Sequence, residues 1–389
     1  MPLRDFVIIA SQRWDFEIGS NARNIALEIS KKYRVVYVNP PEDLISLIKK
    51  FGKRLKKSRV TKEKENLWVL APHSVVASIN WINSKLIYEK LNFLNNKKFA
   101  RNISNELQQL GIMEFVILND NYMFNGLYLK ELLRPVHYLY YIRDYLTIQT
   151  YFKRHGELVE PELMKKADAV VANSTYLKEY AERYNTKSYY VGQGCEVEMF
   201  DDELVKEIPS DLQRILKPIV GYVGFLTAMR LDIDLLILFA KQKPNLSLVL
   251  VGPEDEAFKR SELHQLSNVY FLGRRDPDQL PGYIKGFDVC INPQVINQLT
   301  VGNYPRKVDE YLAMGKPTVA TATKAMEVFR EYTYLASNSE QFLGLVEKAL
   351  HDKNEELKEK RIAFARSHTW KNSVGEIYSV IDELDKKSN

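Results

Sequence analysis

The feature that most constrains this fold is a regular alternation of short β-branched runs with longer stretches of helical periodicity. Several runs are apolar throughout, which is typical of parallel strands covered on both faces. Strands that alternate with helices predict parallel sheets with right-handed crossovers, so each half should form a Rossmann-like α/β domain. The runs predicted as strands are Phe6–Ala10, Val35–Val38, Leu67–Leu70, Phe115–Leu118, Val136–Tyr141, Ala169–Ala172, Ser188–Val191, Ile219–Val223, Ser247–Val251, Val269–Leu272, Val289–Ile291 and Thr318–Ala320.

The alternation breaks between residues 199 and 217, where acidic residues and prolines interrupt the apolar rhythm. We therefore expect an N-terminal domain over 1–198 and a C-terminal domain over 199–369, which suits a chain of 389 residues. A final helix is predicted over 370–387, and it could pack on its own domain or on the first. Its apolar positions recur at helical spacing and are Val374, Ile377, Tyr378, Ile381 and Leu384.

Composition and charge exclude several classes of protein. Hydrophobic residues make up 45% and charged residues 27%, as in an ordinary globular protein, and the net charge of +5 argues against nucleic-acid binding. No run reaches the ~18 apolar residues of a membrane-spanning helix, and the apolar start is too short for a signal peptide. Cys195 and Cys290 are far apart, so we expect reduced thiols and a cytoplasmic protein. No histidine or cysteine pair has metal-ligand spacing, so no metal site is predicted.

A basic stretch over residues 49–64 holds nine lysines and arginines against the single acid Glu63. One interpretation is a solvated loop. Another is a patch that meets anionic lipid headgroups, since each Lys or Arg near a membrane can add about 1 kcal/mol; the protein would then lie at the inner face of the plasma membrane. RNA binding is a third interpretation, but no interleaved aromatic residues support it.

Residues 303–317 carry the strongest chemical signal. They predict a helix with Pro305 at its first position and Gly315 at its C-terminal cap. A helix start offers free N–H groups and a positive dipole end, and Lys307 adds a cation there, so it favours phosphate. Glu310, three residues on, can accept hydrogen bonds from the vicinal hydroxyls of a ribose. Phosphate plus ribose indicates a nucleotide; the alternative is a surface helix on which Lys307 and Glu310 pair.

Glycine-rich segments follow other strands of the second half. Gly221–Thr227 would let backbone approach a phosphate closely, with Arg230 nearby, and a tight turn without ligand is the alternative. Its spacing is not the dinucleotide fingerprint, so NAD binding is not favoured. Gly252 and the Gly273-Arg274 pair are similar but weaker signals.

The order and spacing of these segments resemble the GT-B glycosyltransferases, nearest the retaining family-four-like group that includes enzymes of teichuronic acid and capsule assembly. The resemblance implies two Rossmann-like domains facing across a cleft, with a nucleotide-sugar site in the second and an acceptor site in the first. It implies that Glu310 binds the donor ribose, that Lys307 lies by the diphosphate, and that the final helix crosses back to the first domain. The segments that carry it are Arg34–Pro41, Ala167–Ser174, Gly221–Phe225, Val249–Pro253, Asn268–Gly273, Phe287–Pro293 and Pro305–Pro317.

The sequence departs from this family at three places. Gly302 stands where the family often has the earlier of two glutamates, and Arg230 alone replaces an Arg and Lys pair, which places more of the phosphate role on Lys307 with Arg306. The common Pro-Asn-Gly before the linker is replaced by Gly192–Glu196. The predicted donor-binding residues are Gly224, Phe225, Arg230, Gly252, Gly273, Arg274, Tyr304, Arg306, Lys307 and Glu310.

The predicted acceptor site lies in the first half, in segments that follow strands. Residues 11–20 combine aromatic surface with carboxylates, and residues 119–122 and 140–145 hold similar clusters. We predict Asp15 or Asp144 as a catalytic group that binds the acceptor hydroxyl or acts as base, although each could be an ordinary loop carboxylate. His137 and His155 are expected to be structural. The predicted acceptor-binding residues are Trp14, Glu17, Asp120 and Arg143.

We therefore expect a glycosyltransferase of the hexosyltransferase type that uses no metal or other cofactor and favours retention of configuration. It would move a sugar from a UDP- or GDP-sugar to a saccharide or lipid-linked saccharide in cell-surface polysaccharide assembly. A GT-B-type nucleotide-sugar epimerase and a non-catalytic nucleotide-binding protein are the alternatives.

Overall fold

The computed structural model describes residues 4–16, 20–43, 59–73 and 75–388, and it divides into two compact units. Unit 1 comprises Met1–Gly192 and Trp370–Asn389, and unit 2 comprises Gln193–Thr369. The division falls at Gly192, a few residues before the boundary predicted from the sequence. None of the helices in the described part of the chain is both long and apolar enough to cross a membrane.

Unit 1 is built on an eight-stranded sheet, in the part of the chain that the structure describes, with the order β10-β9-β8-β7-β1-β2-β5-β4. Its strands are parallel except β4, which pairs antiparallel with β5 at one edge. A short pair of strands, β3 (Glu42–Asp43) and β6 (Val75–Val76), lies apart from it. The main strands are β1 (Asp5–Ala10), β2 (Val35–Val38), β4 (Arg59–Lys64), β5 (Leu67–Ala71), β7 (Phe115–Asp120), β8 (His137–Ile142), β9 (Ala169–Ala172) and β10 (Ser188–Tyr190).

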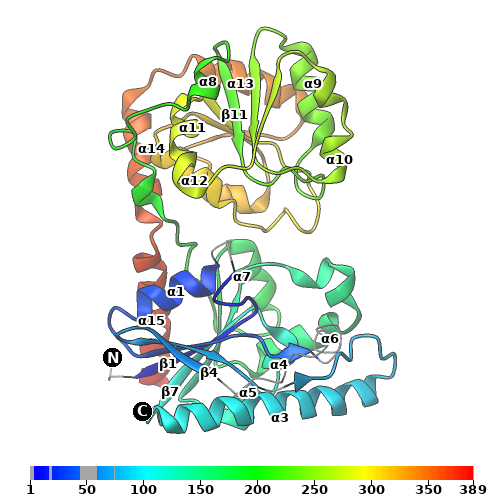
Figure 1. Cartoon of the computed structure of the whole chain (residues 1–389), viewed down its shortest axis with the longest axis vertical. Coiled ribbons are helices and arrows are strands. Elements are labelled where there is room, and N and C mark those ends of the chain that lie inside the picture. Colours follow the sequence, from blue (N-terminus) through cyan, green and yellow to red (C-terminus); the bar gives the residue numbers. More distant parts are fainter. Residues whose placement is uncertain (1–3, 17–19, 44–58, 74, 389) are drawn as a thin grey trace. The chain divides into compact units, whose positions relative to one another are not determined.

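Helices cover both faces of this sheet (Figure 1), which explains why its central strands are apolar without alternation. In β1, Val7 and Ile9 pack with α3, α5 and α6, whereas Phe6 and Ile8 pack on the opposite face with α1 and α15. The predicted C-terminal helix is α15, and it belongs to unit 1. The helices are α1 (Asn21–Ile29), α3 (Lys85–Gln109), α4 (Met123–Gly126), α5 (Leu129–Leu133), η1 (Leu146–Ile148), α6 (Thr150–Lys166), α7 (Thr175–Glu182) and α15 (Trp370–Ser388).

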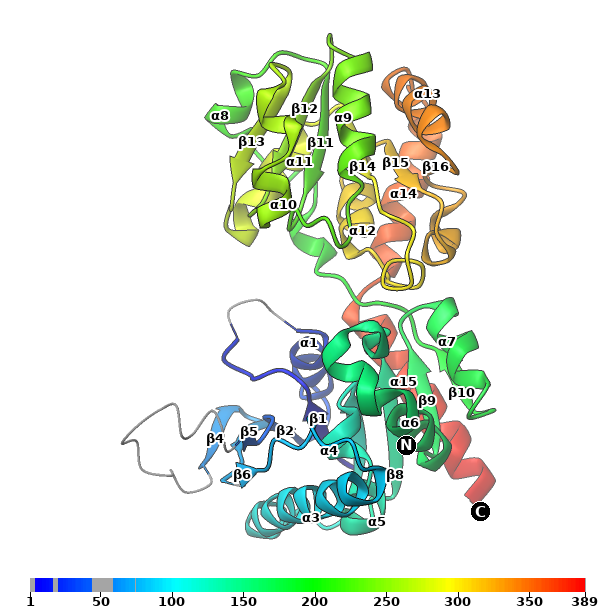
Figure 2. The same cartoon turned by 90° about the vertical axis from the view of Figure 1, so that its right-hand side faces the viewer.

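Unit 2 holds an all-parallel sheet with the order β13-β12-β11-β14-β15-β16, again with helices on both faces (Figure 2). Its strands are β11 (Ile219–Val223), β12 (Ser247–Val251), β13 (Val269–Gly273), β14 (Val289–Asn292), β15 (Thr318–Thr321) and β16 (Tyr334–Ala336). Its helices are η2 (Val197–Met199), α8 (Ser210–Gln213), α9 (Ile233–Gln242), α10 (Glu256–Lys259), η3 (Glu262–Gln265), η4 (Pro277–Gln279), α11 (Leu280–Gly286), α12 (Arg306–Ala313), η5 (Lys324–Phe329), α13 (Ser339–Leu350) and α14 (Glu355–Ser367).

Each sheet has a point at which its strand order reverses. In unit 1, β1 continues to β2 on one side, and β7 begins the other side; in unit 2, β11 and β14 stand in the same relation. Ligands of open α/β sheets bind outside the carboxyl ends of the strands at such a switch point. The ends of β1 and β7, and separately those of β11 and β14, are therefore where each unit should bind a ligand.

Part of the basic stretch is a strand and not the predicted loop. Arg59–Lys64 forms β4, whose Arg59, Lys62 and Lys64 side chains are exposed at the edge of the sheet. Because of its lysines this strand lacks the apolar pattern that predicts strands. Charged residues on an edge strand oppose pairing with another chain, so the same lysines suit its position. Residues 49–58 lie outside the described residues.

Candidate functional site

Two glycines shape the carboxyl end of β11 in unit 2. Gly224 follows β11 with φ +139°, and Gly252 follows β12 with φ +152°. A Cβ on Gly252 would lie 1.9 Å from the carbonyl oxygen of Gly224, so the two strand ends pack backbone against backbone. This close approach explains why both positions are glycine, and it fixes the loop that faces α12.

Lys307, in the first turn of α12, brings its ammonium to this loop. A Cβ on Gly224 would lie 3.0 Å from Lys307 Nζ, which donates a hydrogen bond to the Tyr222 hydroxyl and lies 4.3 Å from the centre of that ring. In the described part of the chain no carboxylate pairs with Lys307, so the alternative of a Lys307–Glu310 ion pair is not formed. A half-buried cation therefore lies at the switch point, and no carboxylate among the described residues pairs with it.

Glu310 lies one turn further along α12 and is half-buried. Burial raises the pKa of its carboxyl, and the nearby Arg306 and Lys307 charges oppose that rise. Among the described residues none donates a hydrogen bond to it, so its oxygens can accept hydrogen bonds from a ligand. The helix itself begins at Arg306 with Pro305 as the N-cap, one residue later than predicted, and Gly315 (φ +68°) follows its C-cap Met314.

A buried polar network that the sequence analysis missed fixes the start of α12. Asp309 is fully buried and accepts from the Tyr304 hydroxyl (2.8 Å) and the Cys195 thiol (3.2 Å). His368 Nδ1 lies 2.7 Å from its other oxygen. The only sequence signal is an acid beside apolar Val308 on a helix with a buried face. Tyr304, predicted as donor-binding, lies in this network, and both cysteines are free thiols; burial raises the pKa of Cys195.

The other predicted donor-binding residues follow strands of the same sheet, some next to the switch point and some further from it. Arg230 donates to Asn303 Oδ1 (2.9 Å), which ties the loop after β11 to the segment before α12. The Phe225 side chain is 54% exposed, and the buried Arg306 Nε has no partner among the described residues. Gly273 ends β13 and the exposed Arg274 follows it; because β12 separates β13 from β11, both lie further from the switch point.

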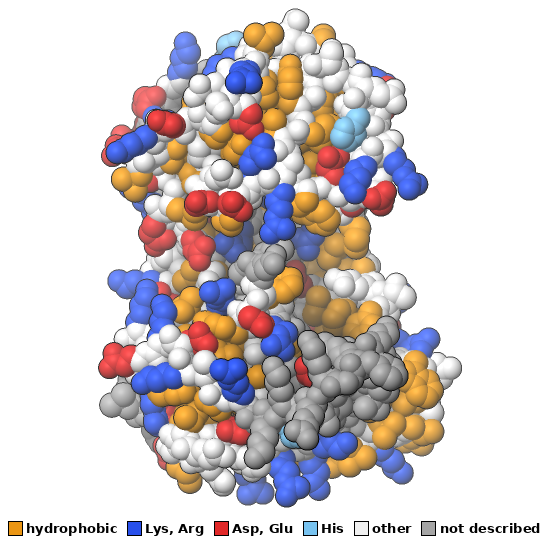
Figure 3. Space-filling view, viewed as in Figure 1, with side chains coloured by type: hydrophobic (Ala, Val, Ile, Leu, Met, Phe, Trp, Pro, Cys, Tyr) orange, Lys and Arg blue, Asp and Glu red, His pale blue; other side chains and the backbone are white. Residues whose placement is uncertain are grey.

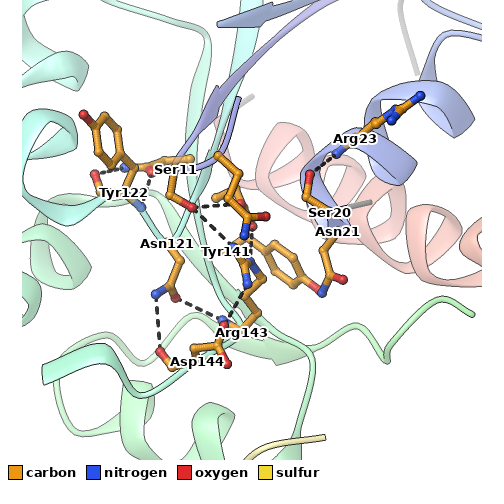
Figure 4. A network of polar contacts seen from close by, with 12 residues as sticks. Ser11, Ser20, Asn21, Arg23, Asn121, Tyr122, Tyr141, Arg143 and Asp144 are labelled. Carbon is orange, nitrogen blue, oxygen red and sulfur yellow. Dashed lines mark hydrogen bonds and ion pairs between the residues drawn. The ribbon is translucent and has the colours of Figure 1, made fainter. Parts of the chain in front are cut away.

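Unit 1 gathers polar side chains at its own switch point (Figure 4). Asp120 ends β7 and is fully buried, and its Oδ1 accepts from Arg143 Nε at 2.9 Å. Arg143 also donates to Asp144 Oδ2 (2.7 Å) and to the Ser11 hydroxyl (3.3 Å). Although burial alone would lower it, the two carboxylates hold the pKa of Arg143 above its ordinary value. We call Ser11, Asp120, Asn121, Arg143 and Asp144 the unit 1 network.

The remaining predicted acceptor-site residues lie outside this network. Asp15 is exposed, and a hydrogen bond from Arg13 (2.9 Å) lowers the pKa of its carboxyl. Trp14 packs edge-on against Tyr37, with ring centres 5.0 Å apart. Glu17 lies outside the described residues. The structure therefore brings Asp120, Arg143 and Asp144 together, but not Asp15.

Both histidines considered as bases have structural contacts. His137 Nε2 lies 2.6 Å from Asp385 of α15, and His155 stacks on Tyr88 with ring centres 3.6 Å apart.

A match to a known protein family lies within unit 2. Residues 217–352 match the family described as Glycosyl transferases group 1. Unit 2 contains a group 1 glycosyl transferase domain. This group 1 domain spans the whole switch-point site, including the Gly224 loop and α12.

A curated relative of the chain is a Bacillus subtilis (strain 168) protein named as a teichuronic acid biosynthesis glycosyltransferase, TuaH. The two are 30% identical over 224 residues, which cover 54% of this chain and 56% of TuaH. The match thus spans about half the length of that relative.

Solved structures match the chain over almost its whole length. Sucrose-phosphate synthase from Thermosynechococcus elongatus has a TM-score of 0.70 at 17% identity and covers 99% of this chain and 100% of its own. Anabaena HepE, solved in complex with UDP, has a TM-score of 0.67 at 16% identity, with coverages of 98% and 100%. These similarities show the fold. They confirm the predicted α/β fold of the GT-B type.

Proposed function

We propose that this protein is a glycosyltransferase that moves a sugar from a UDP- or GDP-sugar to a saccharide or lipid-linked saccharide in cell-surface polysaccharide assembly. The observation that carries the proposal is the Lys307 ammonium at the Gly224 loop, with the Glu310 carboxylate one turn along the same helix; within the described ranges neither side chain has an ion-pair partner. The name of the Bacillus relative and the UDP in the Anabaena structure support the same chemistry.

In this proposal unit 2 holds the donor and stabilises its departure. The diphosphate gains negative charge as the bond to the sugar breaks, and Lys307, Arg230 and the free N–H groups at the start of α12 meet that charge. Glu310 accepts from the ribose hydroxyls and holds the nucleoside in place. The Asp309 network acts only through α12, by fixing where that helix begins.

Unit 1 binds the acceptor in this proposal. Of the two predicted catalytic acids, Asp144 is the better candidate because it belongs to the unit 1 network, whereas Asp15 is exposed and bonded to Arg13. Arg143 holds the Asp144 side chain at 2.7 Å, and the Asp144 carboxylate can accept a hydrogen bond from the acceptor hydroxyl and orient it. With retention of configuration, the leaving phosphate takes the acceptor proton.

A thermal-shift screen against UDP, GDP, dTDP and CMP tests the donor site without an acceptor. We expect UDP or GDP to raise the melting temperature, because a ligand at one hundred times its Kd stabilises the folded state by about 2.7 kcal/mol. A melting temperature that no nucleoside diphosphate changes would contradict the proposal. Conversion of the bound nucleotide sugar without any acceptor would favour the epimerase, and binding without turnover would favour a non-catalytic protein.

We further propose that unit 1 meets an anionic membrane at the inner face of the plasma membrane through residues 49–64. Support comes from the exposed Lys62 and Lys64 of β4. Lys and Arg side chains also gather at the lower edge of the view over α3, which exposes Leu86 and Leu94 (Figure 3). Reversing the charge of both lysines should weaken sedimentation with phosphatidylserine vesicles. Unchanged sedimentation, with a folded variant, would rule the membrane contact out.

A further inference from the structure

A pocket of about 210 Å³ in unit 1 is lined by amide and aromatic side chains, and its lining residues are not those of the unit 1 network. Every side chain that the structure places around it is uncharged. The residues on which the following argument depends are Asn80, Asn92, Tyr122, Phe124 and Tyr151. An uncharged lining disfavours phosphate or carboxylate ligands and leaves neutral polar molecules as the class that fits.

Asparagines on α3 hold two walls of this pocket in place. Asn95 accepts from the Ala77 backbone N–H (2.9 Å) and donates to its carbonyl (3.0 Å), which fixes the segment after β6. Asn96 donates to the Phe124 carbonyl (3.0 Å) and accepts from the Tyr128 N–H (3.2 Å), which fixes α4 and the residues after it. Hydrogen bonds from α3 therefore tie two walls of the pocket to the same helix.

A third asparagine on α3, Asn92, has a side-chain N–H group without a hydrogen-bond acceptor among the described residues. Asn92 is 1% exposed, and its Oδ1 accepts from Asn96 (3.3 Å), but its Nδ2 has no partner among the described residues. Asn80 donates from its Nδ2 to the Tyr151 carbonyl, and its buried Oδ1 is likewise without a partner in the described part of the chain. A buried donor and a buried acceptor left open are rare in folded proteins, because each loses its bonds to water on burial.

We propose that this pocket binds one neutral sugar ring. A hydroxyl group both donates and accepts, so neighbouring hydroxyls of a sugar can satisfy Asn92 Nδ2 and Asn80 Oδ1. The rings of Tyr122 and Tyr151 supply apolar surface for the C–H face of a pyranose.

The pocket adjoins the candidate acceptor site through the chain that follows β7. Tyr122 follows Asn121 of the unit 1 network, and its N–H donates to Asn119 Oδ1 at 3.0 Å (Figure 4). This inference rests on the proposed function. It is that the acceptor is a saccharide, one neutral sugar of which is held in this pocket, next to the sugar that receives the transferred group.

Binding of free glucose, galactose and N-acetylglucosamine, measured by saturation-transfer NMR on the full chain, tests the pocket. Asn92→Asp keeps the oxygen that accepts from Asn96 but removes the open donor, and Tyr151→Ala removes a ring that is 63% exposed, so it should fold normally. We expect one probe to bind, and each variant to weaken it about tenfold, because a pocket polar group left unpaired penalises binding. Asn105→Asp, at an exposed position of α3, is the matched control and should bind like the wild type.

The outcomes separate this inference from the proposed function. Sugar binding that Asn92→Asp and Tyr151→Ala weaken supports the pocket even if no nucleotide binds. Binding that neither variant changes, absence of binding by all three sugars, or a soaked crystal with only water in the pocket would overturn it, whatever the nucleotide screen gives.

Discussion

The Lys307→Ala variant is expected to lose nearly all stabilisation by the donor nucleotide and to lower turnover by about 10²–10³-fold. The reason is that its ammonium lies at the Gly224 loop, where charge on the leaving diphosphate would develop. The variant should fold normally, because in the described structure Lys307 contacts Tyr222 and makes no ion pair. Thermal shift with UDP and GDP, and single-turnover transfer, measure the two effects.

Lys353→Ala, an exposed lysine of the same unit, is the matched control and should behave as the wild type.

Glu310→Gln should also lose turnover, but with no loss of stability at neutral pH. Because burial raises the pKa of Glu310, the stability tied to its neutral form is present at low pH and is lost as the pH rises through the folded pKa, a loss that glutamine avoids. Near-normal turnover in both Lys307→Ala and Glu310→Gln would refute this donor site.

Arg143→Met is expected to cost about 3–5 kcal/mol of unfolding free energy at neutral pH. It leaves the fully buried Asp120 carboxylate without its counter-charge, and breaking a buried ion pair by removing one partner has a cost of this size. Urea unfolding at neutral pH measures the loss.

The double variant Asp120→Asn, Arg143→Met is the control for this prediction. It removes both charges, so it should recover most of the lost stability, although the acceptor site would be damaged in both. A single variant as stable as the wild type would mean that water or another group neutralises Asp120.

The sequence predicted those parts of the fold that depend on burial. Central strands such as β1 are covered on both faces, so their apolar runs were visible in the sequence. The edge strand β4 was missed because it is rich in lysine, which an exposed edge tolerates, and the short strand β16 was missed as well, whereas the edge strands β10 and β13 were predicted.

The site was predictable where local geometry decides it and not where distant residues meet. Lys307 and Glu310 share a helix turn, so spacing alone brought them together. The bonds between Asp309 and His368, and between Asp120 and Arg143, join residues far apart in sequence, and only the folded chain pairs them. For the same reason Asp15, which has the right residue type and position after a strand, could not be told from Asp144.

The placement of α15 decides how this protein can be divided into fragments. Its Trp370, Val374 and Ile377 belong to the same core cluster as Phe6 and Val35. A fragment ending at Gly192 would expose that apolar face to water and would aggregate, whereas residues 193–369 form one continuous segment with both faces of its sheet covered. Unit 2 is thus the natural piece for separate expression and nucleotide titration, and unit 1 requires the segment up to Gly192 together with the α15 segment.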